Sequence, residues 1–198
     1  MRRSEFEVTD EAAFEALLAK CEYGTLSLID DGEPYGVPVN FVWHCGAVCF
    51  HGSREGRKAE IIKKNPKAAF SIVKPYSLIP SYFSDTRAAC PATQFFASAH
   101  IAGSVEIVEN DTEKCAILNA MMQKLQPEGK YETIDAANPI YTKMVSQTAI
   151  WKLTPSSKSM KVKAGQNLSD ERKKSIINQL SQRGEGLDMS TVDIMQKG

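Results

Sequence analysis

The chain has 198 residues, a formal net charge of zero and 42% hydrophobic residues, a composition typical of a soluble globular protein. This length suggests one domain with additional terminal elements, large enough to fold without a metal ion or disulfide bonds. Because there is no basic excess, the composition argues against broad binding to nucleic acid or membranes.

Neither an export signal nor a membrane span is evident. Met1-Arg2-Arg3-Ser4 is basic, but acidic residues follow where a signal peptide would need an apolar stretch. No segment reaches the length of a membrane span. The cysteines are odd in number and scattered, so we expect reduced thiols in a cytoplasmic protein: Cys21, Cys45, Cys49, Cys90 and Cys115.

The first quarter of the chain predicts a helix followed by an antiparallel meander. Pro38 lies inside the second strand and denies it a ladder hydrogen bond, so we expect that strand at an edge or a bulge. The expected elements are a helix over residues 9–21 and strands over 25–29, 35–43 and 48–51, with a hairpin turn at 30–32.

The segment "FHGSREGRKAEIIKKNP", residues 50–66, predicts a helix over 54–64 with Ser53 as its N-cap. Arg54, Arg57 and Lys58 would then share one face of the first turns. Cations are usually disfavoured there, because a helix begins at the positive end of its dipole. A bound phosphate would explain them; the alternative is a solvated helix whose glutamates pair with the cations.

The remaining sequence adds more strands and helices. We expect strands over 68–73, 95–109 and 148–153, with a long aperiodic excursion over 74–94. Helices are expected over 111–125, near 134–144 and over 169–182 with Ser169 as N-cap, followed by a loose tail. Antiparallel strands with few crossovers indicate a closed or partly open barrel, a β-rich α+β fold with flanking helices.

Three motifs occur in a characteristic order: "PYGVPVNF", "FHGSREGRKAEIIKKNPKAAFSIV" and "FFASAHIAGSVEIVENDTEKCAILNAMM". This order resembles the pyridoxamine-phosphate-oxidase-like FMN-binding split barrels, and among them the Nim type, the nitroimidazole-resistance-like flavoproteins. The resemblance covers roughly residues 1–155 and implies an FMN-binding split-barrel domain there, with residues 156–198 as a C-terminal extension of one helix and a loose tail. It also implies a homodimer with FMN at the interface.

The resemblance also implies site residues. Arg57 and Lys58 would hold the FMN phosphate, and Ser98 would make a polar contact. Trp151 is a candidate aromatic near the dimer interface, with a core tryptophan as the alternative. The strand that contacts the isoalloxazine ring through its backbone would be Val37, Pro38, Val39, Asn40 and Phe41, and the strand end along the flavin would be His51, Gly52 and Ser53.

Two departures from the oxidases affect the expected reaction. Gly56 replaces the serine before the Arg-Lys pair, and residues 37–42 lack the basic residues of the true oxidases. Oxidation of pyridoxamine phosphate itself is therefore not expected. The expected reaction transfers electrons from a reduced donor through FMN to a small organic acceptor, with nitro compounds as one candidate.

Alternatives remain for the function and for one histidine. His51 could donate a proton to a bound substrate, or serve only to hold the cofactor. A non-catalytic flavin carrier or sensor would share these motifs, and a haem protein could use His51 or His100 as an iron ligand. A zinc site is not expected, because the spacing of Cys45 and Cys49 is not that of a zinc knuckle.

Overall fold

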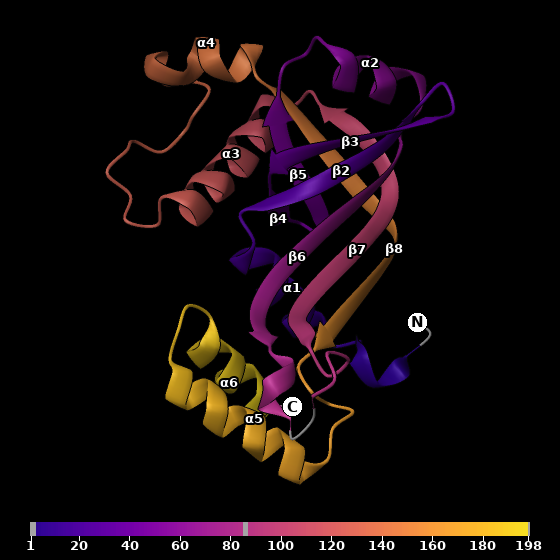
Figure 1. Cartoon of the computed structure of the whole chain (residues 1–198). Coiled ribbons are helices and arrows are strands. Elements are labelled where there is room, and N and C mark those ends of the chain that lie inside the picture. Colours follow the sequence, from indigo (N-terminus) through magenta and orange to yellow (C-terminus); the bar gives the residue numbers. More distant parts are fainter. Residues whose placement is uncertain (1–2, 85–86, 198) are drawn as a thin grey trace. The chain divides into compact units, whose positions relative to one another are not determined.

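The computed structural model describes residues 3–84 and 87–197. No helix in these ranges is both long and apolar enough to cross a membrane. Figure 1 shows the elements, which in chain order are η1 (Ser4–Phe6), β1 (Glu7–Val8), α1 (Glu11–Lys20), β2 (Tyr23–Asp30), β3 (Glu33–Asn40), β4 (Val42–His44), β5 (Ala47–Gly52), α2 (Arg57–Lys64), β6 (Lys67–Ile79), η2 (Ser81–Phe83), β7 (Thr93–Val108), α3 (Asp111–Leu125), α4 (Pro139–Gln147), β8 (Ala149–Lys163), α5 (Asp170–Arg183) and α6 (Asp188–Lys197).

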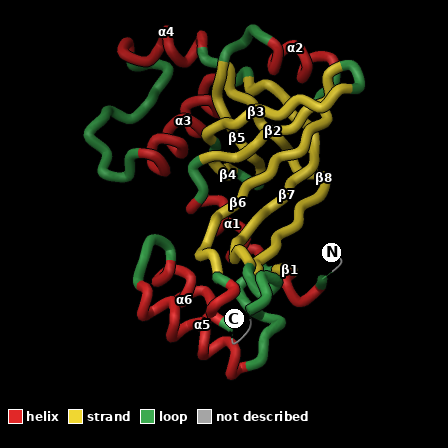
Figure 2. Tube along the Cα trace, viewed as in Figure 1, coloured by secondary structure: helices red, strands yellow, loops and turns green. Residues whose placement is uncertain are grey.

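The strands of the described residues form one antiparallel sheet. Its order is β3-β2-β6-β7-β8-β5-β4, with β1 paired to β8, and Figure 2 shows these strands in yellow. Strand β3 stands at one end of this order but also contacts β5, near the other end. The sheet therefore curves back on itself. This confirms the predicted β-rich α+β split barrel with flanking helices.

The chain forms two compact units. One comprises Met1–Leu17, Val73–Ala99 and Ser159–Gly198, and the other comprises Leu18–Ile72 and His100–Lys158. Strands β6, β7 and β8 contribute residues to both units. We call the first the C-terminal unit, because it contains α5 and α6, and the second the barrel unit.

The core of the barrel unit follows the alternation of its strands. Leu26 and Leu28 of β2 are buried, and Thr25, Ser27 and Ile29, which alternate with them, are exposed. Helix α3 packs on β4, and Ile117 joins a cluster of buried side chains with Cys49 of β5. Residues 47–50 of β5 are all buried. Strand β5 is therefore covered on both faces, unlike β3, which stands at the sheet edge with Pro38 in its middle.

In the C-terminal unit, a buried carboxylate ties two helices to a strand. Asp188 is 1% exposed and accepts hydrogen bonds from Arg183 Nε at 2.7 Å and Nη2 at 2.6 Å. It also accepts from the Ser77 hydroxyl at 2.5 Å. Thr191 Oγ1 accepts from the backbone N–H of Ser77 at 2.8 Å. The ion pair joins α5 to α6, and the serine joins both helices to β6.

Several predicted elements end elsewhere in the structure. The expected return strand is two strands, β3 and β4, interrupted at Phe41, and the expected excursion after residue 73 begins only where β6 ends at Ile79. Strand β8 continues past Pro155 to Lys163. The prediction of a loose C-terminal tail was wrong, because residues 188–197 form α6, which packs on α5. Ser169 caps α5 as predicted, accepting from the N–H of Arg172 at 3.3 Å.

Replacing Asp188 with alanine is expected to lower the free energy of unfolding by about 3–5 kcal/mol, because it leaves the Arg183 guanidinium without its buried partner. Hydrogen exchange at the amides of α5 and α6, combined with denaturant unfolding, measures the change. Asp193→Ala, at an exposed position of the same helix, is the control and should cost less than about 0.5 kcal/mol. Equal losses of unfolding free energy in the two variants would contradict a stabilising role for the Asp188–Arg183 ion pair.

The same network predicts an acid dependence. Arg183 holds the pKa of the Asp188 carboxyl well below its usual range, with help from Ser77 and the backbone N–H of Glu185. The folded pKa therefore lies below the unfolded value of about 3.9. The stabilisation is complete above that value and is lost as the pH falls through the folded pKa. The difference in unfolding free energy between wild type and Asp188→Ala should shrink in acid. A difference that does not change with pH would contradict the stabilising role of the ionised Asp188 carboxylate.

Candidate functional site

The candidate site lies where β5 ends and α2 begins. Phe50 is fully buried and pairs with Trp151 of β8, and the last two residues, His51 and Gly52, pair with Ile150 and Ala149. His51 is exposed, because the alternation of the strand turns it to the opposite face. The chain then leaves the sheet through residues 53–56 and enters α2.

The start of this helix differs from the sequence prediction. Helix α2 begins at Arg57, and Gly56 holds the N-cap position with φ 97°, a conformation that favours glycine. Ser53 does not cap the helix; its hydroxyl accepts from the N–H of Glu55 at 3.1 Å within the loop. Arg54 precedes the helix and pairs with Glu109 at 3.4 Å. The expectation that three cations share one helix face is therefore wrong for Arg54.

Because the N-cap is glycine, no side chain caps α2. The first backbone hydrogen bond of the helix runs from the N–H of Glu60 to the carbonyl of Gly56 at 3.1 Å. The amides of the first turn before Glu60 therefore have no intrahelical acceptor. Such amides, at the positive end of the helix dipole, form the usual setting for a bound phosphate.

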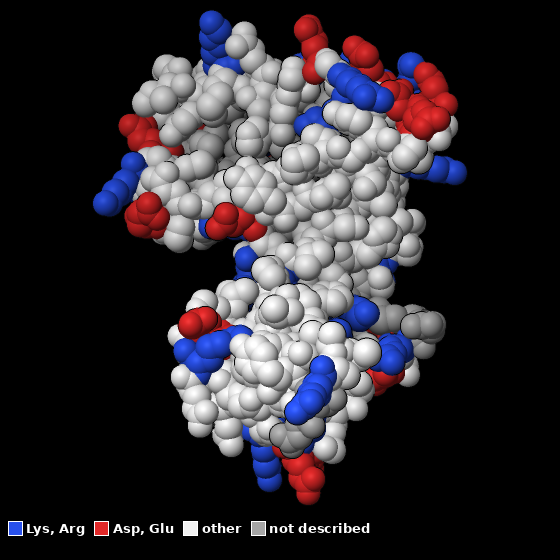
Figure 3. Space-filling model, viewed as in Figure 1, with Lys and Arg blue, Asp and Glu red and all other residues white. Residues whose placement is uncertain are grey.

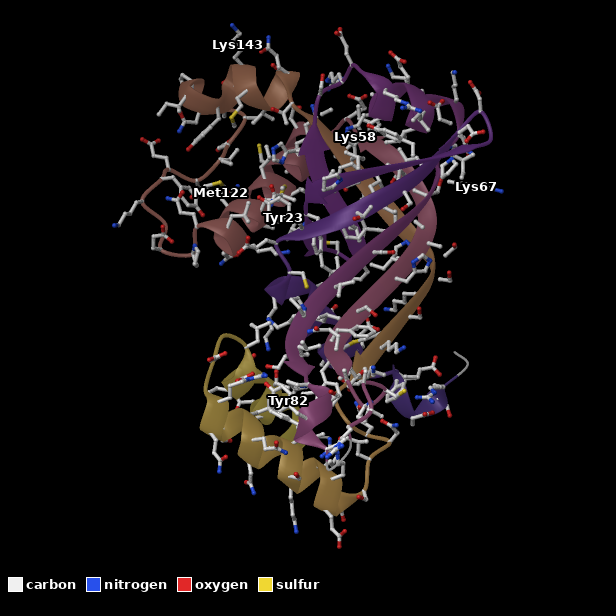
Figure 4. All side chains as sticks on the ribbon, viewed as in Figure 1. Tyr23, Lys58, Lys67, Tyr82, Met122 and Lys143 are labelled. Carbon is white, nitrogen blue, oxygen red and sulfur yellow. The ribbon has the colours of Figure 1, made fainter. Side chains whose placement is uncertain are left out.

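The Lys58 ammonium lies against the end of β5 (Figure 4). Its Nζ is 5.2 Å from the ring centroid of Phe50. A Cβ added at Gly52 would come within 2.6 Å of the same Nζ, so only glycine leaves room for the ammonium in this position. No carboxylate pairs with Lys58 among residues 3–84 and 87–197, and burial lowers its pKa. The ammonium is thus a half-buried cation without an acidic partner.

His51 shares this environment. The imidazole is exposed on one side but partly desolvated by the chain around it, and its pKa is lowered first by this desolvation and then by the positive charge of Lys58. The imidazole is therefore neutral at pH 7, carrying a proton on one nitrogen and a lone pair on the other. It can donate or accept one hydrogen bond at the end of β5.

Arg57 differs from its neighbour because its charge is already paired. Its Nε donates to Asp30 Oδ2 at 2.9 Å, and its guanidinium carbon lies 4.6 Å from the ring centroid of Tyr35. These contacts join the start of α2 to the β2–β3 hairpin. The Arg57 side chain remains 59% exposed, so its unused N–H groups are accessible from solvent.

Strand β3 offers a free backbone edge. Val39 and Phe41 are buried, and Pro38 is exposed on the opposite face. The side-chain amide of Asn40 donates to the carbonyl of Glu22 at 3.1 Å, which steadies the end of the strand. Since β3 pairs with β2 and ends the sheet order, one row of its backbone groups, including those of Gly36 and the carbonyl of Pro38, has no partner in β2. Val37 stands opposite Leu26 in a hydrogen-bonded pair, so its backbone groups point toward β2. The free row could contact a flat ring.

A hollow that the sequence did not predict adjoins Gly52. It has a volume of about 470 Å³, and α4 and the residue after it form its other wall. Two apolar side chains of α4 one turn apart, Ile140 and Met144, are 66% and 41% exposed. In the sequence, this apolar pair was the available signal of a hollow here. It could not be recognised, because an apolar pair in a short helix equally well predicts core packing. The lining residues are Gly52, Ile140, Lys143, Met144, Gln147 and Thr148.

Two further predicted residues are Ser98 and Trp151. Ser98 lies half-buried on β7, in the C-terminal unit, and its role stays a prediction. Trp151 is 2% exposed, as expected of a core tryptophan, and its place near a dimer interface stays a prediction. Its indole Nε1 has no hydrogen-bond partner. No group of three metal-binding side chains occurs in the part of the chain that the structure describes.

Replacing Lys58 with methionine is expected to raise the pKa of His51, because it removes one of the two causes of the lowered value. The new pKa should stay below about 6.5, the ordinary value, since burial remains. NMR titration of the His51 imidazole measures the shift. The control is Lys63→Met, at an exposed position near the end of α2, which should leave the titration unchanged. An unchanged His51 pKa in Lys58→Met would show that the two groups are not coupled.

Three solved structures share the fold of this chain at 19–22% sequence identity. A protein named for 5-nitroimidazole antibiotic resistance, from Bacteroides thetaiotaomicron, is 21% identical; the match covers 79% of this chain and 86% of that one, with a TM-score of 0.65. The flavocytochrome Anf3 of Azotobacter vinelandii is 22% identical over 80% of this chain and 69% of that one, with a TM-score of 0.67. An FAD and haem binding protein of Mycobacterium smegmatis is 19% identical over 84% and 78%, with a TM-score of 0.68.

The sequence itself matches at the level of a family. No curated protein matches it, but the profile of the pyridoxamine 5'-phosphate oxidase family matches residues 10–162. That range contains the β5–α2 junction, the β2–β3 hairpin and most of β8. The chain therefore belongs to the pyridoxamine 5'-phosphate oxidase family.

Proposed function

We propose that this protein binds FMN and passes electrons from a reduced donor through the flavin to a small organic acceptor, with nitro compounds as one candidate class. The observation that carries the proposal is the Lys58 ammonium, half-buried beside Gly52 with no acidic partner among the described residues. A phosphate would supply the missing negative charge, and the uncapped start of α2 would add backbone donors.

Arg57 and Lys58 would contribute unequally to phosphate binding. Lys58 has no competing carboxylate in the part of the chain that the structure describes, whereas Arg57 already donates to Asp30. A phosphate that engaged Arg57 would have to share it with that carboxylate or approach its free N–H groups. Most of the phosphate affinity is therefore assigned to Lys58 and the helix amides, with Arg57 holding the hairpin in place.

A homodimer would complete the site. A flat isoalloxazine ring needs two walls, and the edge of β3 provides one. Figure 3 shows few charged side chains over β2 and β3, whereas charges of both signs gather near α2 and the hairpin tip. Tyr23 on β2 is 59% exposed. An uncharged surface with an exposed aromatic side chain supports contact with a second copy of the chain.

The flavin would supply the redox chemistry, and the protein would bind and orient it. His51 is the group at the end of β5 that could hydrogen-bond to a substrate being reduced, and in its protonated form it could donate a proton and become neutral imidazole. We propose a cytoplasmic location, in which the free cysteines, two of them exposed, would remain reduced.

Haem is the second candidate, because two proteins of the same fold are named as a flavocytochrome and as an FAD and haem binding protein. His51 and His100 would be the candidate iron ligands. The Nδ1 of His100 lies 3.0 Å from the Ser71 hydroxyl, which leaves Nε2 for a ligand. A Soret band in the purified protein, in place of a flavin spectrum, would favour haem.

Replacing Lys58 with alanine is expected to weaken FMN binding by roughly 10–100-fold, the effect of losing a hydrogen bond to a charged group. Gly52→Ala should also weaken it, because the added methyl group would displace the ammonium. Riboflavin, which lacks the phosphate, should bind wild type and Lys58→Ala equally. Titration of flavin-free protein measures all of these, with Lys63→Ala as the control. Unchanged FMN affinity in Lys58→Ala would refute the phosphate assignment.

Electron transfer requires a separate measurement. In the FMN-loaded protein, NADH or NADPH should bleach the flavin spectrum in anaerobic stopped flow, and an added nitro compound should restore it. If neither donor reduces the flavin at a useful rate, the protein is better described as a non-catalytic flavin carrier or sensor. His51→Gln should slow reoxidation by the acceptor without changing FMN affinity if the imidazole donates a proton. It should weaken FMN binding without slowing reoxidation of the bound flavin if the imidazole only holds the cofactor.

A further inference from the structure

A second hollow lies entirely within the C-terminal unit. Its volume is about 270 Å³, just below the roughly 300–1,000 Å³ of pockets for drug-sized ligands. The start of β7, the end of β8, the loop before α5 and the first turns of α5 contribute to its wall. Much of this wall lies beyond residue 162, where the match to the oxidase family ends.

One part of the wall is cationic. Arg3, Lys163 and Arg172 all line the hollow, and no aspartate or glutamate is among the described residues that do so. Lys163 Nζ donates to the Thr93 hydroxyl. Arg172 donates to the carbonyl of Phe83 and, at 2.6 Å, to the hydroxyl of Ser84. Since a guanidinium has five N–H donors, these two bonds hold Arg172 in place and leave others for a ligand.

The opposite part of the wall is apolar and rigid. Ile79, Phe95 and Ile176 are 1%, 2% and 2% exposed and come from two strands and a helix. Leu168 completes this side, on the turn that Gly165 begins with φ +86°. These side chains belong to the packed core of the unit, so this wall is formed before any ligand binds.

We propose that this hollow binds a small organic acid, with its carboxylate against Lys163 and Arg172 and its apolar body against Leu168 and Pro91, which are half-buried. An inorganic anion would leave Leu168 and Pro91 uncovered, and a neutral apolar molecule would leave Lys163 and Arg172 without a negative partner. Arg3 already pairs with Glu5 at 3.9 Å. The volume limits the ligand to about one aromatic ring or a short branched chain.

The electrostatics of Lys163 support this assignment. Burial, Lys161 and Arg3, in that order, lower the pKa of Lys163. Its ammonium is therefore crowded by other cations, with a hydroxyl in place of a carboxylate as its partner. A bound carboxylate would relieve that repulsion, and binding would be linked to protonation of Lys163. The site is independent of the proposed flavin function, because every lining residue belongs to the C-terminal unit.

Benzoate is the test probe, with benzamide as its uncharged analogue. In NMR titrations of the full-length ¹⁵N-labelled protein, benzoate should bind in the millimolar range or tighter and shift the amides of residues 92–95 and 163–176. Benzamide should bind at least about tenfold more weakly, since it lacks the charge-assisted contacts. Lys163→Met should weaken benzoate binding by a similar factor without unfolding the protein, because it removes a crowded cation.

Two further variants distinguish this site from general binding. Lys174→Met, at an exposed position of α5, should leave benzoate affinity unchanged. Leu168→Trp should fill the hollow and abolish binding while the shifts of the barrel unit stay in place. The proposal is overturned if benzoate binds nowhere near these residues, if benzamide binds equally well, or if Lys163→Met has full affinity. Inorganic phosphate that binds more tightly than benzoate at the same amides would also overturn it, in favour of a simple anion site.

Discussion

The candidate site depends on the pairing of β5 with β8. Phe50 stands opposite Trp151 in this ladder, and both side chains are buried. The pairing ends at Gly52, opposite Ala149, so the chain must leave the sheet there and turn into α2. Because the Phe50 ring is held rigidly, the Lys58 ammonium has a fixed surface to rest on. Strand pairing therefore determines where the unpaired charge lies.

Adjacent cations have different roles because a helix directs neighbouring side chains about 100° apart. Arg57 reaches the β2–β3 hairpin, where Asp30 and Tyr35 contact it. Lys58 instead lies against β5, where no carboxylate of the described residues pairs with it. Arg57 thus serves mainly to join α2 to the β2–β3 hairpin. The charge of Lys58 remains available for the ligand that we propose. Burial without an ion pair keeps the electrostatic potential of this charge high, since water cannot screen it fully.

The C-terminal segment contributes more than a covering helix. Residues 159–198 form one compact unit with residues 1–17 and 73–99. The Asp188–Arg183 ion pair and Ser77 hold α5 and α6 to β6. Fixing α5 in this way also fixes Arg172 and Ile176, which line the hollow of that unit. The chain thus has two cationic surfaces of different character: we propose a phosphate for the start of α2 and an acid with an apolar body for the hollow.

Local sequence signals determined the elements with strong periodicity or clear caps. Helix α3, the β2–β3 hairpin and the Ser169 cap of α5 follow from them, and so does the position of Pro38 in an edge strand. The order of the motifs was sufficient to identify the family and its split barrel. The pair Arg57 and Lys58 could also be selected from sequence, because basic residues at a helix start need a physical explanation.

Only the tertiary structure decided which charges are paired. Asp30 is 27 residues before Arg57, and Glu109 is 55 residues after Arg54, so no local pattern could show that these cations are neutralised and Lys58 is not. The helix start also escaped prediction, because Ser53 and Gly56 are both acceptable N-caps and the loop geometry chose between them. Likewise α6 has a weak local signal, and its buried Asp188 gains a partner only when α5 and β6 are in place. Periodicity and caps act between near neighbours in sequence, whereas electrostatic pairing depends on distances in space that only the folded chain sets.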